Sequence, residues 1–199
     1  VKEDNALLAV DMTNPDLYRD GRIAVPRGSV HVFRSRYLWK GVGYERFRIS
    51  NYSLTSVVIN VSLRFESDFA DIFEVRGQKR NHKGKIQKDR LVLAYEGLDG
   101  CVREAHLRFS PAPDEMTASQ AVFHIMLEPK AETTVTMTVG CEVGSAPRPG
   151  FAYDQAMAEA STSLKTEQSQ DCEVHTSNAQ FNEWWNRSLL DLRMMVTAT

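Results

Sequence analysis

The amino-acid sequence predicts a mainly β protein, an antiparallel β-sandwich followed by C-terminal α-helices. Three observations favour this fold class. Apolar and polar residues alternate with a period of two before residue 144, turn-forming residues separate many short candidate strands, and helical spacing appears only after Gly144. Many short strands joined by hairpin-length links are typical of an antiparallel sandwich. The chain has no glycine-rich strand-to-helix turn, which argues against a dinucleotide-binding fold.

Two segments carry the clearest strand pattern. In residues 56–65 every odd position from Val57 to Phe65 is apolar, and residues 60, 62 and 64 are polar. Residues 133–143 repeat the pattern, with apolar side chains from Val135 to Val143 and threonines between them. Such strands have one buried and one solvated face. The weaker strand candidates are Ala6–Asp11, Ser29–Leu38, Tyr44–Asn51, Asp89–Tyr95, Val102–Ser110 and Gln120–Leu127.

The composition changes after Gly144. Residues 145–150 are rich in proline, serine and glycine, which predicts a linker. Residues 152–165 are alanine-rich with apolar residues at helical spacing, so we expect a helix there, and a loop over residues 163–173. The predicted domains are therefore a β-sandwich over 1–144, a linker with a helix over 145–176, and a further helix over 177–199.

The last helix is predicted to begin after Ser177 or Asn178, either of which is a suitable N-cap. Most of its apolar residues, Trp184 among them, fall on one side, but Leu190 and Met194 fall near the opposite side. A helix that is apolar on both sides needs cover on both sides. We infer the first helix of a truncated helical domain. The alternative is a C-terminal helix packed on its own sheet or on a dimer mate.

Composition limits the function classes. The chain has 199 residues with 24 Lys and Arg against 26 Asp and Glu, a formal charge of −2, so we expect no nucleic-acid or membrane partner. None of the apolar runs has the roughly 20 residues needed to span a bilayer. Cys101, Cys141 and Cys172 form no metal-binding or redox pair, and the five histidines lack metal-ligand spacing. We expect buried or half-buried thiols, a cytoplasmic location, and neither cofactor nor metal.

Acidic residues cluster after the strand at 56–65. Asp68, Asp71 and Glu74 could in principle supply the two carboxylates that glycosidases use as acid and as base or nucleophile. They would share a face only if this stretch were helical. The structural alternative is turn formation by the aspartates together with ion pairing to Arg76 or Arg80.

Two neighbouring segments offer further candidates. Residues 76–90 carry seven cations and a single acid, without aromatic residues for base stacking, so the segment is either a solvated hairpin tip or a loop reaching a partner domain, with Arg76 or Arg80 binding a carboxylate or sugar hydroxyls. Residues 95–100 form a predicted tight turn. It is either a simple hairpin corner or a sugar contact in which Tyr95 stacks and Asp99 accepts hydrogen bonds.

Several of these segments resemble a known family. The stretch Asp68-Phe69-Ala70-Asp71-Ile72-Phe73-Glu74-Val75-Arg76-Gly77, followed by Arg80, Gly84 and Tyr95-Glu96-Gly97-Leu98-Asp99-Gly100, resembles the N-terminal domain of bacterial glycogen debranching enzymes (amylo-α-1,6-glucosidase-like proteins). Residues 8–17, 31–36 and 44–46, together with Asn51, are also similar to the family. Residues 181–182 and 188–195 resemble the beginning of the helical toroid of that family.

The resemblance implies a β-sandwich of the large two-sheet type that precedes an (α/α)₆ barrel carrying the glycosidase chemistry. The catalytic carboxylates of the family belong to that barrel, so no catalytic residue is assigned to this chain. Asp68, Asp71, Glu74, Arg76, Arg80, Tyr95 and Asp99 are then candidates for a sugar site or a domain interface. The implied partners are the C-terminal (α/α)₆ catalytic domain of the same chain and an α-glucan such as glycogen.

Two rival functions remain open from the sequence. One is a standalone carbohydrate-binding or protein-interaction sandwich. The other is a small hydrolase that uses Asp68 and Glu74 as its carboxylate pair.

Overall fold

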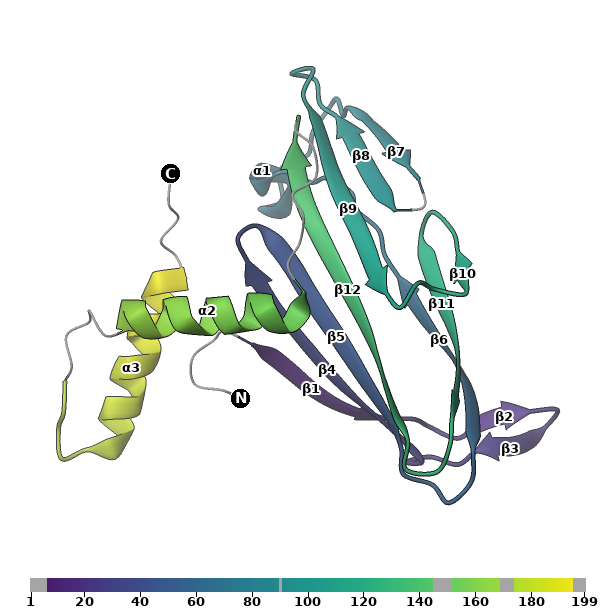
Figure 1. Ribbon diagram of the computed structural model, residues 1–199. Coiled ribbons are helices and arrows are strands. Elements are labelled where there is room, and N and C mark those ends of the chain that lie inside the picture. Colours follow the sequence, from purple (N-terminus) through teal and green to yellow (C-terminus); the bar gives the residue numbers. More distant parts are fainter. Residues whose placement is uncertain (1–6, 90, 145–151, 169–173, 195–199) are drawn as a thin grey trace.

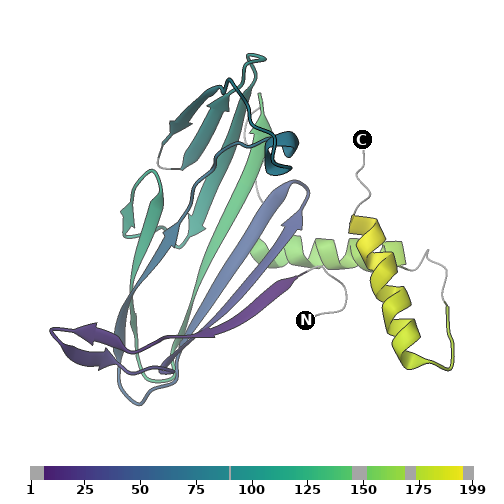
Figure 2. The ribbon, with the colours of Figure 1, turned by 180° about the vertical axis from the view of Figure 1, so that it is seen from behind.

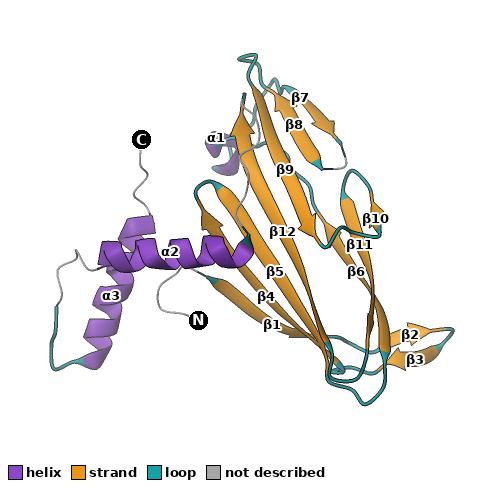
Figure 3. Ribbon diagram, viewed as in Figure 1, coloured by secondary structure: helices purple, strands orange, loops and turns teal. Residues whose placement is uncertain are grey.

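The computed structural model describes residues 7–89, 91–144, 152–168 and 174–194 (Figure 1). The elements in chain order are β1 (Leu8–Thr13), β2 (Leu17–Arg19), β3 (Arg22–Val25), β4 (Val30–Trp39), β5 (Val42–Asn51), β6 (Val57–Arg64), α1 (Ile72–Val75), β7 (Lys85–Lys88), β8 (Val92–Glu96), β9 (Val102–Ser110), β10 (Glu115–Met116), β11 (Gln120–Leu127), β12 (Glu132–Val143), α2 (Tyr153–Gln168) and α3 (Ala179–Met194). The predicted fold class, antiparallel sheets followed by C-terminal helices, is confirmed (Figure 3).

Seven strands form one large antiparallel sheet in the order β1-β4-β5-β12-β9-β8-β7. Its longest hairpin joins β4 to β5 through the two-residue turn Lys40-Gly41. Both turn residues have positive φ, 48° and 76°, which matches the right-handed twist of the flanking strands and makes glycine the suitable second residue. The sheet also pairs β5 with β12, two strands that lie far apart in the sequence.

A second, three-stranded sheet with the order β10-β11-β6 packs against one face of the large sheet. The core between the two layers contains Ile49 and Val135 from the large sheet and Ile59 and Phe123 from the small one. The other buried members are Val25, Val30, Phe47, Val57, Ala121 and Leu127. The alternation in β6 and β12 therefore predicts the correct buried residues at Val57, Ile59 and Val135.

Helix α2 packs on the opposite face of the large sheet. Its Tyr153 and Ala156 form a second buried cluster with Tyr37, Val42 and Tyr44. Tyr44 and the core residue Phe47 lie three positions apart on β5, and side chains an odd number of positions apart point to opposite faces of a strand. Figure 2 accordingly shows α2 behind the sheet and α1 in front of it.

Several elements differ from the sequence-based expectation. The short strands β2, β3, β7 and β10 and the one-turn helix α1 were not expected, because elements of two to four residues are too short to establish a period. Helix α2 continues to Gln168, so the expected loop over residues 163–173 is wrong in its first part. Asn178 accepts a hydrogen bond from the Phe181 amide at 3.2 Å, as expected of an N-cap.

Cys101 and Cys141 are both exposed, which corrects the expectation of buried or half-buried thiols at these positions. Both lie near the end of the sheet that carries the turn between β8 and β9, where side chains remain in solvent. Cys172 lies outside the described residues. Within the described parts of the chain, none of the helices is both long and apolar enough to cross a membrane.

Candidate functional site

The candidate residues centre on the connection between β6 and β7. This segment leaves the small sheet and reaches the large one, and it contains α1. Asp71 caps α1, because its Oδ1 atom accepts hydrogen bonds from the amides of Phe73 and Glu74, each at 2.9 Å. Glu74 reciprocates through Oε2, which accepts from the Asp71 amide at 3.3 Å. This capping box stabilises a helix that is otherwise too short to persist.

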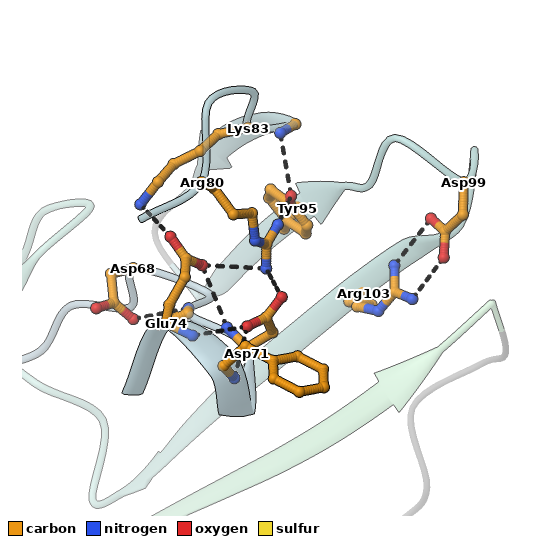
Figure 4. A network of polar contacts seen from close by, with 11 residues as sticks. Asp68, Asp71, Glu74, Arg80, Lys83, Tyr95, Asp99 and Arg103 are labelled. Atoms are coloured by element: carbon orange, nitrogen blue, oxygen red, sulfur yellow. Dashed lines mark hydrogen bonds and ion pairs between the residues drawn. The ribbon is translucent and has the colours of Figure 1, made fainter. Parts of the chain in front are cut away.

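Arg80 binds both acids of the capping box (Figure 4). Its Nη2 atom lies 2.7 Å from Oδ2 of Asp71 and 3.0 Å from Oε2 of Glu74. Lys83 completes the neutralisation with its Nζ atom 2.8 Å from Oε1 of Glu74. Of the two arginines weighed from the sequence, Arg80 is therefore the one that pairs with these acids. We call Asp71, Glu74, Arg80, Lys83 and Tyr95 the Arg80 cluster.

Tyr95 on β8 supplies the support beneath the cluster. Its hydroxyl accepts hydrogen bonds from Nη1 of Arg80 at 3.1 Å and from the Gly84 amide at 3.0 Å. Its ring stacks on Phe69, with ring centroids 5.4 Å apart and planes 15° apart. Gly84 is required here, because a Cβ atom at that position would lie 2.0 Å from the Glu96 carbonyl oxygen. Tyr95 thus connects the loop to β8 of the large sheet.

Hydrogen bonds and neighbouring charges in the cluster lower the pKa values of its two acids and so favour their ionised forms. Backbone hydrogen bonding from Glu74, helped by Arg80, holds the pKa of Asp71 below its ordinary value. The hydrogen bond from Lys83, helped by the Asp71 amide and Arg80, does the same for the pKa of Glu74. A glycosidase acid needs a raised pKa so that it keeps its proton at neutral pH. Neither Asp71 nor Glu74 meets that requirement, and both are held in ion pairs.

The remaining candidates are not part of the Arg80 cluster. Asp99 forms a bidentate pair with Arg103, at 2.7 Å and 3.1 Å, and also accepts the Cys101 amide. The hydrogen bond from Arg103 holds the pKa of Asp99 far below its ordinary value. Asp68 is exposed and accepts a hydrogen bond from the Ala70 amide at 3.0 Å. Arg76 is exposed at the end of α1.

Sequence analysis missed the partners that complete these contacts. Lys83, Phe69 and Gly84 belong to the Arg80 cluster or support it, and Arg103 is the partner of Asp99. The position of Arg103 four residues after Asp99 is the one local pattern that could have indicated a pair. Across the described ranges, no group of three or more His, Cys, Asp or Glu residues is placed to hold a metal ion.

The cluster holds α1 in a position where its apolar side chains face solvent. Ile72, Phe73 and Val75 are 56%, 57% and 72% exposed, and α1 has no buried residue. An exposed apolar group of this kind, presented by a rigid turn, is suited to contact with another protein surface. The geometry thus separates the polar side chains whose mutual contacts fix the loop from the apolar side chains of α1 that face solvent.

Comparison with known proteins identifies the family of the chain. Residues 1–138 match the family described as the N-terminal domain of (some) glycogen debranching enzymes. The match spans more than half of the chain, and the chain belongs to this family. Among curated proteins, none matches the sequence.

Three solved structures are similar to the chain. A kojibiose phosphorylase-like protein from the human microbiome has 13% sequence identity to this chain and a TM-score of 0.49. The alignment covers 95% of this chain and 23% of the phosphorylase-like chain. A polysaccharide lyase has 12% identity and a TM-score of 0.37 over 73% of this chain and 27% of its own. An aldose 1-epimerase-like protein of Escherichia coli K12 has 11% identity and a TM-score of 0.37, over 71% of this chain and 67% of the epimerase-like chain. The chain thus spans about a quarter of the first of these proteins.

Proposed function

We propose that this chain is the noncatalytic N-terminal β-sandwich domain of a glycogen-debranching-type glycoside hydrolase. In this proposal the chain supports a C-terminal helical barrel of the same polypeptide, and that barrel hydrolyses α-1,6-glucosidic branch linkages of a glycogen-like α-glucan. The observation that supports the noncatalytic assignment is the ion pairing of Asp71 and Glu74 with Arg80, which keeps both carboxylates ionised, so that neither can serve as the protonated acid of glycoside hydrolysis.

The supporting role rests on exposed apolar side chains at two places. Ile72, Phe73 and Val75 lie on α1, and Phe181, Trp184 and Leu192 lie on α3. Trp184 is 63% exposed, which is unusual for so large an apolar side chain. We propose that both surfaces contact the catalytic domain. The exposed thiols of Cys101 and Cys141 are compatible with a reducing compartment, and we propose a cytoplasmic location.

The test compares the 199-residue chain with the full product of its reading frame on a branched α-glucan. We expect hydrolysis by the full product and none by the chain alone. Substantial turnover by the isolated chain, lost on Glu74→Gln without loss of folding, would instead favour the small-hydrolase alternative.

Binding of the glucan is measured in parallel by calorimetry. If the isolated chain binds the glucan as tightly as the full product, the standalone carbohydrate-binding function is favoured. Weak or absent binding by the isolated chain supports a scaffold role.

A further inference from the structure

The two edges of the seven-stranded sheet differ in how they are protected against pairing. Strand β7 is at one edge and β1 at the other (Figures 1 and 3). Lysines on an edge strand oppose the approach of a further strand, and β7 has Lys85 and Lys88 at its two ends. Strand β1 has neither lysine nor proline, and it pairs with β4 without a bulge over its full length. Every residue of β1 is exposed.

The exposed side chains of β1 form an apolar row. Leu8, Val10 and Met12 lie opposite Arg36, Arg34 and Val32 of β4, so all three point to the face that carries the small sheet. The other face of β1 carries Ala9, Asp11 and Thr13. An unprotected edge with an apolar row is the arrangement that a further β-strand can extend.

The direction of the backbone groups determines which residues can bind such a strand. The Asn14 amide donates to the Val30 carbonyl of β4 at 3.1 Å. Because amide and carbonyl groups of alternate residues point to opposite sides of a strand, those of Ala9, Asp11 and Thr13 point away from β4. These odd-numbered residues are therefore the ones that can form a new hydrogen-bonded ladder.

The sequence of β1 is complementary to itself in one antiparallel register. With Val10 opposite Val10 of a second copy, Leu8 lies opposite Met12, and Ala9 lies opposite Asp11. The apolar pairs then occupy the closely spaced, non-hydrogen-bonded positions, where side chains contact best. Shifting the strands in one direction places Asp11 opposite Asp11, which is repulsive, and shifting them in the other leaves Met12 without its apolar partner.

We propose that β1 pairs with β1 of a second copy of this chain in the register centred on Val10, joining two seven-stranded sheets into one. This interface is independent of the proposed function. Stable protein interfaces bury at least about 1,200 Å², and a ladder of six residues from each copy is a small interface by that standard. We therefore expect weak association that increases with protein concentration.

The first test measures the mass of the chain by sedimentation across a dilution series. We expect the mass to double at high concentration and Val10→Lys to remain monomeric, because two lysines would then lie opposite each other. The matched control is Ile86→Lys on β7, since Ile86 is 43% and Val10 37% exposed. The control should dimerise like the unmodified chain. A chain that stays monomeric, or a dimer that persists in Val10→Lys, overturns the proposal.

The second test maps the register by disulfide formation after Cys101, Cys141 and Cys172 are replaced by serine. Directly opposed non-hydrogen-bonded positions have Cβ atoms close enough for a disulfide. Val10→Cys should therefore cross-link two copies on oxidation much more completely than Leu8→Cys or Asp11→Cys. Preferential cross-linking through Asp11→Cys would show a different register and would contradict the proposal.

Discussion

The hydroxyl of Tyr153 on α2 lies 2.7 Å from the Oγ atom of Ser35 on β4, and both side chains are buried. The Tyr37 hydroxyl donates to the Tyr153 carbonyl, and the guanidinium of Arg46 lies 4.1 Å from the centre of the Tyr153 ring. Burial, together with the neighbouring Tyr153, raises the pKa of the Tyr37 phenol, which therefore stays protonated and remains a donor. Tyr153 thus attaches α2 to the large sheet.

Replacing Tyr153 by phenylalanine should destabilise the chain. The change leaves the buried Ser35 hydroxyl without its tyrosine partner, which costs about 1–2 kcal/mol of unfolding free energy. Urea denaturation measures the loss. The control Tyr18→Phe removes the hydroxyl of a 67% exposed tyrosine and should change stability little. Equal stability of both variants would mean that α2 does not depend on this contact.

Gly84→Ala should be strongly destabilising, by about 3 kcal/mol, because the new methyl group would overlap the Glu96 carbonyl and the Tyr95 ring. Thermal unfolding followed by circular dichroism measures the effect. Gly140→Ala on β12 is the matched control, since a Cβ atom there meets no neighbour within 4 Å. Equal unfolding temperatures for the two variants would contradict the close contact between Gly84 and strand β8.

Arg80→Ala should loosen the connection between β6 and β7 while leaving the sheets folded. The substitution removes the cation shared by Asp71 and Glu74 and one donor to Tyr95. We expect faster amide hydrogen exchange over residues 69–84 and unchanged exchange in β5 and β12. Lys79→Ala, at an exposed position in the same segment, is the control and should leave exchange as it is. Unaltered exchange in Arg80→Ala would exclude Arg80 as the centre of the cluster.

The contribution of the Arg80 cluster should depend on pH. The pKa values of Asp71 and Glu74 lie below their ordinary values of 3.8 and 4.5 in the folded chain. A lowered folded pKa gives stability that is present above the unfolded pKa and is lost as the pH falls through the folded pKa. The difference in melting temperature between the unmodified chain and Arg80→Ala should therefore be constant near neutral pH and shrink below these ordinary values. A difference that grows on acidification would contradict the assigned pairing.

Phe73→Ser should show whether α1 contributes to contact with the catalytic domain rather than to the stability of the isolated chain. Phe73 is exposed, so the stability of the isolated chain should change by no more than about 0.5 kcal/mol. In the full product of the reading frame, the same substitution should lower the melting temperature if α1 contacts the catalytic domain. Leu98→Ser, at an exposed apolar position in the turn between β8 and β9, serves as the control. Unfolding profiles that match the control in both proteins would remove α1 from the proposed interface.

Local sequence patterns were sufficient for the main strands and the long helices. The alternation in β6 and β12 and the expected bounds of β9 and β11 agree with the structure, because each strand of eight or more residues contains its own period. The start of α3 is likewise indicated by Asn178, which accepts a hydrogen bond from the amide of Phe181 only three residues away. These features depend on interactions that are local in the chain.

For the candidate site, the sequence indicates which residues are candidates but not which of them pair with one another. The sequence places acids and cations in one segment, but the choice of Arg80 over Arg76 depends on the path of the chain from α1 to β7 and on the position of the Tyr95 hydroxyl. Asp99 lies close to these residues in the sequence, yet it pairs with Arg103 of β9. Ion-pair partners are selected by distance in space, which composition does not encode.

By itself the sequence determined a two-layer antiparallel fold, since burial of one face of each strand requires a period of two. Only the tertiary structure decided how Tyr153 meets Ser35 across 118 positions and how β1 comes to be an edge, because such contacts form only after the sheets have assembled.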